Sequence, residues 1–199
     1  MIDDILRERF RRPVDATGAW LSRRGVSAEA LTVAGFAIGV AGCVSVVGEH
    51  YWLALLCLAL NRLADLLDGA VARASRVTDW GGFLDILLDL LIYSGFVLAF
   101  AIGRPENALA AAVLIYTFLA TGASFLAVAN IAAKRGISRE PPKKKSFFYK
   151  AAIAEGAETT AYLALICLFP GTFVALTYGF AAICWVSVAG HLLWARRFR

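Results

Sequence analysis

Six apolar stretches, each about as long as a bilayer is thick, dominate the sequence. A helix needs ~20 residues to cross a hydrocarbon layer of ~30 Å. Of the 199 residues, 60% are hydrophobic, which is more than the core of a soluble domain of this size hides. The stretches cover residues 28–49, 51–73, 80–102, 106–133, 149–169 and 171–195. We therefore predict an all-α, polytopic membrane protein with six transmembrane helices.

The residues before the first stretch have a different pattern. Apolar side chains are interspersed with arginines and aspartates over residues 3–24, as in an amphipathic helix that lies in the membrane interface. We expect Pro13 to divide this helix in two. Because charges of both signs precede any apolar run, we expect no signal peptide. The predicted organisation is an interfacial segment over residues 1–26 and a six-helix transmembrane domain over residues 27–199.

Basic residues gather on one side of the predicted spans. The N-terminus, the loop between spans two and three, the loop between spans four and five, and the C-terminus all lie on that side, and only Arg104 stands in a loop on the other. The positive-inside rule then places both termini in the cytoplasm, as in a bacterial or archaeal cell membrane. None of these residues belongs to a soluble recognition module, so we expect the lipid bilayer and no nucleic acid as a partner.

Four aspartates, Asp65, Asp68, Asp85 and Asp89, lie within the second and third apolar stretches. An ionised side chain in hydrocarbon costs at least ~2.5 kcal/mol, so four together require a cation, a water-filled cavity or both. The first pair is three residues apart and the second four, which places each pair on one face of its helix. A short turn joins the two helices, so all four carboxylates are expected near a common centre at the cytoplasmic end.

The residue types around these aspartates favour a magnesium-dependent phosphate site. Carboxylates without nearby histidine or cysteine form an all-oxygen ligand set, which suits Mg²⁺ or Mn²⁺ and does not suit zinc. Gly69, Ala72 and Gly81 leave room for a nucleotide diphosphate to approach the backbone, and Arg73 is a candidate partner for phosphate.

A purely structural interpretation is the alternative. Helix-end carboxylates can cap helices or pair with Arg62, Arg73 or Arg76 without any chemistry. We favour this interpretation for Asp79, which we expect to be the N-cap of the third span. For the other four aspartates it is disfavoured, because there are too few inward-facing arginines to neutralise both pairs.

The segment Asp65-Leu-Leu-Asp68-Gly69-Ala-Val-Ala72-Arg73, followed by Gly81-Gly-Phe-Leu-Asp85-Ile-Leu-Leu-Asp89, resembles the motif of the CDP-alcohol phosphatidyltransferases. The family pattern is D-x-x-D-G-x-x-A-R, a spacer, and G-x-x-x-D-x-x-x-D. The spacer here is one residue shorter than usual unless Gly82 takes the glycine role. The frequent Pro-Asn before the first span is Ala-Glu in this chain, although Thr32 keeps its place.

This resemblance implies transfer of a phosphatidyl group, or another substituted phosphate, from CDP-diacylglycerol or another CDP-alcohol to a small hydroxyl acceptor, with release of CMP. It implies one or two Mg²⁺ or Mn²⁺ ions and a homodimer. Asp89 would be the catalytic base. The implied metal ligands are Asp65, Asp68, Asp85 and Asp89, and the implied nucleotide-binding residues are Thr32, Asp65, Gly69, Ala72, Arg73 and Gly81.

Four residues around the fifth apolar stretch are candidates for binding the acceptor. Glu155 and Glu158 would favour a cationic or polyhydroxyl acceptor, whereas Lys143 and Lys150 would favour a phosphorylated one. The two glutamates can equally be an acidic first turn that pairs with the lysines. The sequence leaves both interpretations open.

Two other membrane proteins use comparable aspartates. Aspartate-rich prenyltransferases bind diphosphate through Mg²⁺, but their two motifs lie far apart, whereas here both pairs lie in one helical hairpin. A cation transporter with an intramembrane aspartate cluster is the alternative function. Against it, no second set of acids occurs in the outer half of the spans.

Smaller features indicate tight packing. Gly35 and Gly39 form a small-xxx-small face, which usually marks close contact between helices. The four cysteines are scattered singly among apolar neighbours and are expected to be packing residues.

Overall fold

Helices account for nearly all of residues 2–136 and 156–198, the part of the chain that our computed structural model describes. No strand occurs among these residues, so the all-α prediction is confirmed for them. The α-helices are α1 (Ile2–Arg23), α2 (Ala28–Val47), α3 (Tyr51–Ala74), α4 (Asp79–Gly103), α5 (Ala108–Lys134), α6 (Gly156–Leu168) and α7 (Phe173–Ala195). Three short 3₁₀ turns are η1 (Pro105–Asn107), η2 (Pro170–Thr172) and η3 (Arg196–Phe198).

Four of the described helical segments are long and apolar enough to cross a membrane, which identifies an integral membrane protein. They are α2, α4, α5 with η1, and α7 with its flanking 3₁₀ turns. Helix α3 has 24 residues but carries several charges, and the described part of the fifth apolar stretch, α6, has 13 residues. The count of six spans and the interfacial position of α1 therefore stay predictions.

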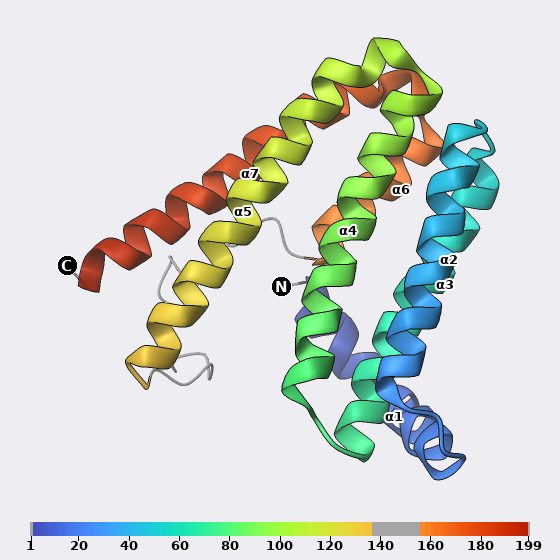
Figure 1. Cartoon of the computed structure of the whole chain (residues 1–199), viewed down its shortest axis with the longest axis vertical. Helices are drawn as coiled ribbons and strands as arrows, with labels where there is room; N and C mark the ends of the chain where they lie inside the picture. Colours follow the sequence, from blue (N-terminus) through green and yellow to red (C-terminus); the bar gives the residue numbers. More distant parts are fainter. Residues whose placement is uncertain (1, 137–155, 199) are drawn as a thin grey trace.

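The helices run up and down between two ends of the molecule (Figure 1). Helices α2, α3 and α4 stand together, while α5 leans away from them and α7 returns alongside α5. The turns that join α2 to α3 and α4 to α5 lie at the upper end in Figure 1. Helix α1, the start of α2 and the turn from α3 to α4 lie at the lower end.

Small residues on α2 bring it close to its neighbours, as the sequence predicted. A Cβ atom added at Gly39 would lie 2.6 Å from Ile92 Cδ1, and one at Gly42 would lie 2.7 Å from Phe96 Cζ, both on α4. At Gly35 the added atom would lie 2.8 Å from a side chain of α3. A side chain at any of these positions would force its neighbours to shift, so these glycines allow α2 to pack closely on both α3 and α4.

The apolar core lies toward the end of the molecule away from the aspartates. The buried residues of α4 run from Ile92 to Phe100, all in its second half. The Phe100 ring stacks on Phe173 with centroids 4.7 Å apart, and Tyr162 stacks on Phe180 at 4.5 Å. The four cysteines are free and three are buried, as expected of packing residues. The packed half therefore holds the helices together, and the polar side chains, including the aspartates, lie toward the other end.

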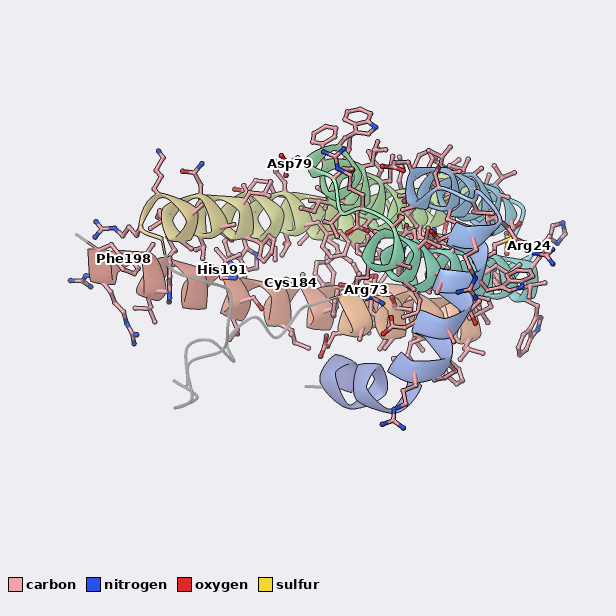
Figure 2. The ribbon with its side chains drawn as sticks, turned by 90° about the horizontal axis from the view of Figure 1, so that it is seen from below. Arg24, Arg73, Asp79, Cys184, His191 and Phe198 are labelled. Carbon is pink, nitrogen blue, oxygen red and sulfur yellow. The ribbon has the colours of Figure 1, made fainter. Side chains whose placement is uncertain are left out.

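Helix α1 packs against α3 at the lower end of the molecule (Figures 1 and 2). A Cβ atom at Gly18 would lie 2.6 Å from both the carbonyl carbon and the Cβ of Ala70, so the backbones nearly touch there. The expectation that Pro13 divides α1 was wrong, because one helix continues through it. Residues Ile2–Arg12 precede Pro13 in that helix, which leaves more than two helical turns on each side.

Candidate active site

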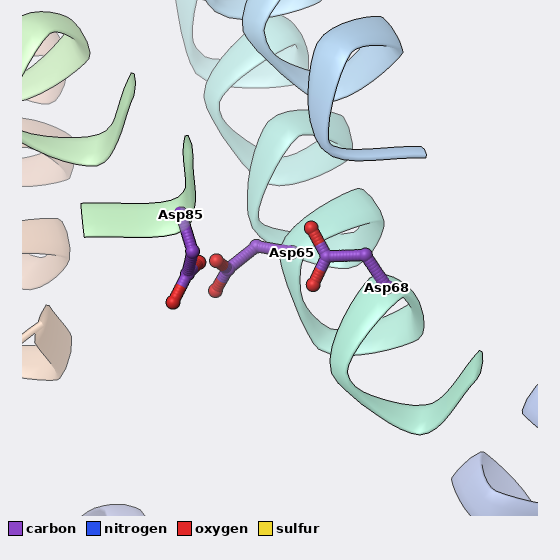
Figure 3. A group of neighbouring side chains, drawn as sticks. All are labelled: Asp65, Asp68 and Asp85. Atoms are coloured by element: carbon purple, nitrogen blue, oxygen red, sulfur yellow. The ribbon is translucent and has the colours of Figure 1, made fainter. Parts of the chain in front are cut away.

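Three carboxylates converge between α3 and α4. Asp65 and Asp68 point from one face of α3, and Asp85 points toward them from the second turn of α4 (Figure 3). One oxygen of each carboxylate lies within 4.8 Å of the other two. Both helices pack against α2, which therefore holds the two halves of the cluster in place. The spacing in the sequence predicted this convergence.

Asp68 is the most buried of the three carboxylates, with 7% of the residue exposed. The Thr32 hydroxyl lies 2.6 Å from Asp68 Oδ2 and donates a hydrogen bond to it. Thr32 stands in the first turns of α2, so α2 orients this carboxylate. A short hydrogen bond from a neighbouring group of this kind fixes a metal ligand and raises its affinity.

Asp89 lies outside the group of three that shares the 4.8 Å spacing. Its two oxygens accept hydrogen bonds from the Arg62 guanidinium, at 2.5 Å to Oδ1 and 3.1 Å to Oδ2. The Tyr93 hydroxyl also donates to Oδ2, at 3.1 Å. The structure thus joins Asp89 to Arg62, for which the sequence indicated only a structural pairing with the aspartates.

The three clustered carboxylates fit a hard divalent cation. Mg²⁺ binds oxygen ligands at ~2.1 Å, so ligands on opposite sides of the ion lie ~4.2 Å apart. The ligand oxygens, one from each carboxylate, lie within 4.8 Å of one another, which exceeds this value by less than 1 Å. The cluster offers carboxylate oxygens and none of the nitrogen or sulfur ligands that zinc prefers. Asp65, Asp68 and Asp85 are therefore the residues that would hold Mg²⁺ or Mn²⁺.

A cavity of about 250 Å³ opens beside the carboxylates, between α2, α3 and the start of α4. Five of the six predicted nucleotide-binding residues line it, and the sixth, Asp65, lines a much smaller cavity next to it. Those five residues are Thr32, Gly69, Ala72, Arg73 and Gly81. The structure brings the separated parts of the motif together around one space, together with Asp68 and Asp85.

Arg73, the candidate phosphate ligand, is held at the cavity by α1. Its Nη2 and Nε atoms donate to Asp15 Oδ1 at 2.7 and 3.2 Å. Half of the Arg73 side chain and 39% of the Asp15 side chain are exposed. These residues are 58 positions apart, and their pairing was not predictable from the sequence because it depends on how α1 crosses α3.

The turn into α4 corrects one prediction. Thr78, and not Asp79, is the N-cap of α4: its backbone is extended, and its hydroxyl accepts from the Gly81 amide at 3.0 Å. Asp79 is instead the first residue of α4, where its negative charge interacts favourably with the positive end of the helix dipole. The Thr78 hydroxyl also donates to Glu29 of α2 at 3.1 Å. A Cβ atom added at Gly81 would lie 3.0 Å from the Thr78 hydroxyl oxygen, whereas one added at Gly82 would meet nothing within 4 Å.

Three of the four predicted acceptor residues, Lys143, Lys150 and Glu155, lie outside the described residues. Glu158 is half-buried in the first turn of α6. A Cβ atom added at Gly156 would lie 3.4 Å from the Tyr93 hydroxyl, so the start of α6 reaches the side of the site where Asp89 lies. The structure therefore brings α6 to the site and does not test the role of its acids.

A family model described as CDP-alcohol phosphatidyltransferase matches residues 26–193 of the chain. The inner membrane protein YnjF of Escherichia coli is 42% identical over 188 residues, which are 94% of this chain and 91% of that protein. This relative matches almost end to end.

Two further relatives carry the names of synthases. The phosphatidylinositol phosphate synthase of Streptomyces avermitilis is 36% identical over 118 residues, 56% of this chain and 48% of that enzyme. The archaetidylinositol phosphate synthase of Pyrococcus horikoshii is 32% identical over 99 residues, 49% of this chain and 53% of that enzyme. The chain thus matches about half of the length of each synthase.

Proposed function

The chain belongs to the CDP-alcohol phosphatidyltransferase family, and from this premise we propose that it transfers a phosphatidyl group from CDP-diacylglycerol to a small polar alcohol, releasing CMP. The family and the named relatives support a role in phospholipid synthesis. Donor and acceptor are the finer parts of the proposal. Family membership also favours this reaction over a cation transporter.

One observation carries the proposal. Three carboxylates that fit a divalent cation stand at the wall of a cavity of about 250 Å³ that the remaining motif residues line. A diphosphate needs a cation beside its oxygens, and a nucleotide needs a space with little side-chain bulk at its wall. Gly69 and Gly81 supply that space, and Arg73 supplies a guanidinium that can pair with phosphate.

The transfer exchanges one phosphorus–oxygen bond for another. The acceptor hydroxyl oxygen bonds to the phosphorus that carries the diacylglycerol, and the bond from that phosphorus to the bridging oxygen of CMP breaks. Asp65, Asp68 and Asp85 would hold a divalent ion, which would neutralise the charge that develops on the departing CMP. Asp89 accepts the proton of the acceptor hydroxyl. Because a carboxylate has about four acceptor positions, Asp89 can take this proton while it accepts the hydrogen bonds from Arg62 and Tyr93.

The position of the site suits a donor that is partly soluble in lipid and partly in water. CDP-diacylglycerol has acyl chains that belong in lipid and a nucleotide that belongs in water. We place the site at the cytoplasmic surface, with both termini on that side, because the basic residues of the sequence gather at that end of the spans. The donor would enter from the bilayer and the acceptor from the cytosol.

The acceptor is the least determined partner. The two synthase relatives are named for products that contain inositol phosphate, which makes an inositol phosphate the first acceptor to test. The basic residues Lys143 and Lys150 would attract its phosphate, whereas Glu155 and Glu158 would favour a cationic or polyhydroxyl acceptor. We also propose a homodimer, on the family resemblance alone.

The test is CMP release by the purified protein in proteoliposomes containing CDP-diacylglycerol and Mg²⁺ or Mn²⁺. A panel of inositol phosphate, glycerol 3-phosphate, inositol and serine is added singly. Release that depends on one acceptor identifies the substrate. Failure to bind CDP-diacylglycerol with or without the metal would contradict the proposal.

A further inference from the structure

Basic side chains gather where α5 and α7 end. Lys134 is the last residue of α5, Arg135 follows it, and Arg196 and Arg197 lie in η3 directly after α7; all four are exposed. The two helices run side by side (Figure 1), and nitrogen-tipped side chains lie around Phe198 at this end of the pair (Figure 2). Neither helix nor η3 contains an aspartate or a glutamate. We call the four residues the basic end of the α5–α7 pair.

Contacts between the two helix ends hold the basic end together. Arg135 Nη2 donates to the Phe198 carbonyl at 3.2 Å, and the guanidinium lies over the Phe198 ring, 4.9 Å from its centroid. The Trp194 ring packs against the edge of the same ring, with centroids 4.7 Å apart. The positive-inside rule accounts for basic residues at this end of each span, but it does not require them to converge. Here residues 63 positions apart meet in one surface.

An apolar face of α7 adjoins the basic end. Leu192 and Leu193 are at least half exposed and lie about one helical turn before Arg196 and Arg197. Helix α7 is long and apolar enough to span a membrane, so these leucines would face hydrocarbon while the charges that follow them reach the headgroups. This order of side chains is complementary to a phospholipid, with acyl chains beside the leucines and a phosphate beside the arginines.

The charge of the basic end selects among phospholipids. Near a membrane surface, each lysine or arginine strengthens the attraction to anionic lipid about fivefold. A zwitterionic headgroup gains much less, because its ammonium group offsets its phosphate. The arginines can also pair with phosphate oxygens through two N–H groups at once. Charge complementarity therefore favours an anionic phospholipid as the occupant of this surface.

We propose that the basic end binds the headgroup phosphate of an anionic phospholipid, at a site separate from the nucleotide cavity. The residues that line that cavity come from α2, α3, α4 and the turn between α3 and α4, and none comes from α5 or α7. The bound lipid is therefore not the donor in that cavity. It holds the end of the α5–α7 pair at the level of the headgroups. This inference does not depend on the proposed function.

The test uses Trp194, which lies between the apolar and the basic side chains, as a fluorescent reporter. The other four tryptophans are removed by Trp20→Phe, Trp52→Phe, Trp80→Phe and Trp185→Phe. The full-length chain is placed in phosphatidylcholine vesicles that contain brominated phosphatidylglycerol or brominated phosphatidylcholine, which quench nearby tryptophan. We expect phosphatidylglycerol to be preferred at Trp194 about fivefold or more. Equal quenching by the two lipids would overturn the proposal.

A matched pair of double variants tests whether the basic end causes this preference. In Arg196→Gln with Arg197→Gln, the preference should fall to about twofold or less. Arg23→Gln with Arg24→Gln removes the same charge from exposed arginines at the end of α1 and should leave the preference at Trp194 unchanged. An equal fall in both variants would show that the net charge of the chain attracts the lipid, and would overturn the site.

Two conditions check the nature of the interaction. The preference should disappear in ~1 M salt, where charges are screened beyond ~3 Å, and a preference that persists there would contradict its electrostatic origin. Millimolar inorganic phosphate or inositol phosphate, at constant ionic strength, should leave the preference unchanged. Its loss would assign the basic end to a soluble phosphate and overturn the lipid proposal.

A measurement on the wild type avoids the tryptophan replacements, should these prevent folding. Native mass spectrometry in detergent, with phosphatidylglycerol and phosphatidylcholine added in equal amounts, compares how much of each lipid stays bound. We expect the wild type to retain more phosphatidylglycerol and the Arg196→Gln, Arg197→Gln variant to lose this excess. Equal retention of both lipids by the wild type would contradict the proposal. CMP release is not measured, so either result leaves the proposed function untouched.

Discussion

Arg73 of the aspartate motif donates two hydrogen bonds to Asp15 of α1, at 2.7 and 3.2 Å. A helix outside the motif therefore orients a side chain at the wall of the nucleotide cavity. This contact gives α1 a structural role at the site besides any contact with the membrane surface.

Replacing Arg73 should weaken binding of the donor. We expect Arg73→Gln to raise the KM for CDP-diacylglycerol about 10-fold or more, since a hydrogen bond to a charged group contributes ~1.5–3 kcal/mol. Asp15→Asn is the control: this pair is half-exposed, so its loss should lower the free energy of unfolding by only ~0–1 kcal/mol. Steady-state kinetics measures the KM of both variants, and denaturation in detergent measures the free energy of unfolding. An unchanged KM in Arg73→Gln would contradict its role in binding phosphate.

The hydroxyl of Thr32 should support metal binding. In Thr32→Val the shape is kept but Asp68 loses its 2.6 Å hydrogen bond, so Mn²⁺ affinity should fall ~10–100-fold. Thr117→Val is matched to it, because that buried hydroxyl donates to the Val113 carbonyl one turn earlier in its own helix, α5. Mn²⁺ titration should separate the two variants; equal affinities would argue against a role for Thr32.

The close crossing of α1 and α3 should tolerate no side chain. Gly18→Ala places a methyl group 2.6 Å from Ala70, which costs ~1–3 kcal/mol of unfolding free energy as the helices separate. Gly179→Ala on α7 meets nothing within 4 Å and should be neutral or slightly stabilising. Thermal unfolding in detergent compares them. If Gly18→Ala is as stable as Gly179→Ala, α1 does not dock as described.

An ion pair outside the membrane-spanning segments should give a dependence on pH. Arg104 Nε donates to Glu49 Oε2 at 3.0 Å, and this hydrogen bond lowers the pKa of Glu49 below its ordinary value of 4.5. A carboxyl whose pKa is lowered by folding stabilises the fold above its unfolded pKa and loses that contribution as the pH falls through the folded pKa.

The Tm of the wild type should therefore exceed that of Glu49→Gln near neutral pH, and the difference should shrink on acidification below about pH 4.5. Scanning both proteins in detergent over this range measures it. A difference that stays constant down to about pH 3 would show that Glu49 acts through something other than its charge.

The sequence predicted the long helices well, because hydrophobic length determines them. The second apolar stretch was placed at residues 51–73, and α3 spans Tyr51–Ala74. Spacing also predicted that Asp65, Asp68 and Asp85 converge, since a helical face and a short turn require it. The N-cap was misplaced by one residue, because threonine and aspartate both cap helices and only the extended backbone of Thr78 decides between them.

Two ion pairs between helices were not predictable from the sequence. The pairing of Arg62 with Asp89 depends on how α3 and α4 are rotated about their axes, which the pattern of apolar residues defines only roughly. The pairing of Asp15 with Arg73 depends on the crossing of α1 at Gly18. Small residues in an amphipathic helix were the one signal in the sequence for that crossing.

The most direct test of the central claim compares CMP release by the wild type and by Asp68→Asn in the same proteoliposomes, with CDP-diacylglycerol, Mg²⁺ and the acceptor that the panel identifies. Asp68 belongs to the carboxylate cluster and is bonded by Thr32. We predict acceptor-dependent release by the wild type and a loss of about 10²-fold or more in the variant. Equal rates in the two proteins would contradict the assignment of the active site to this cluster.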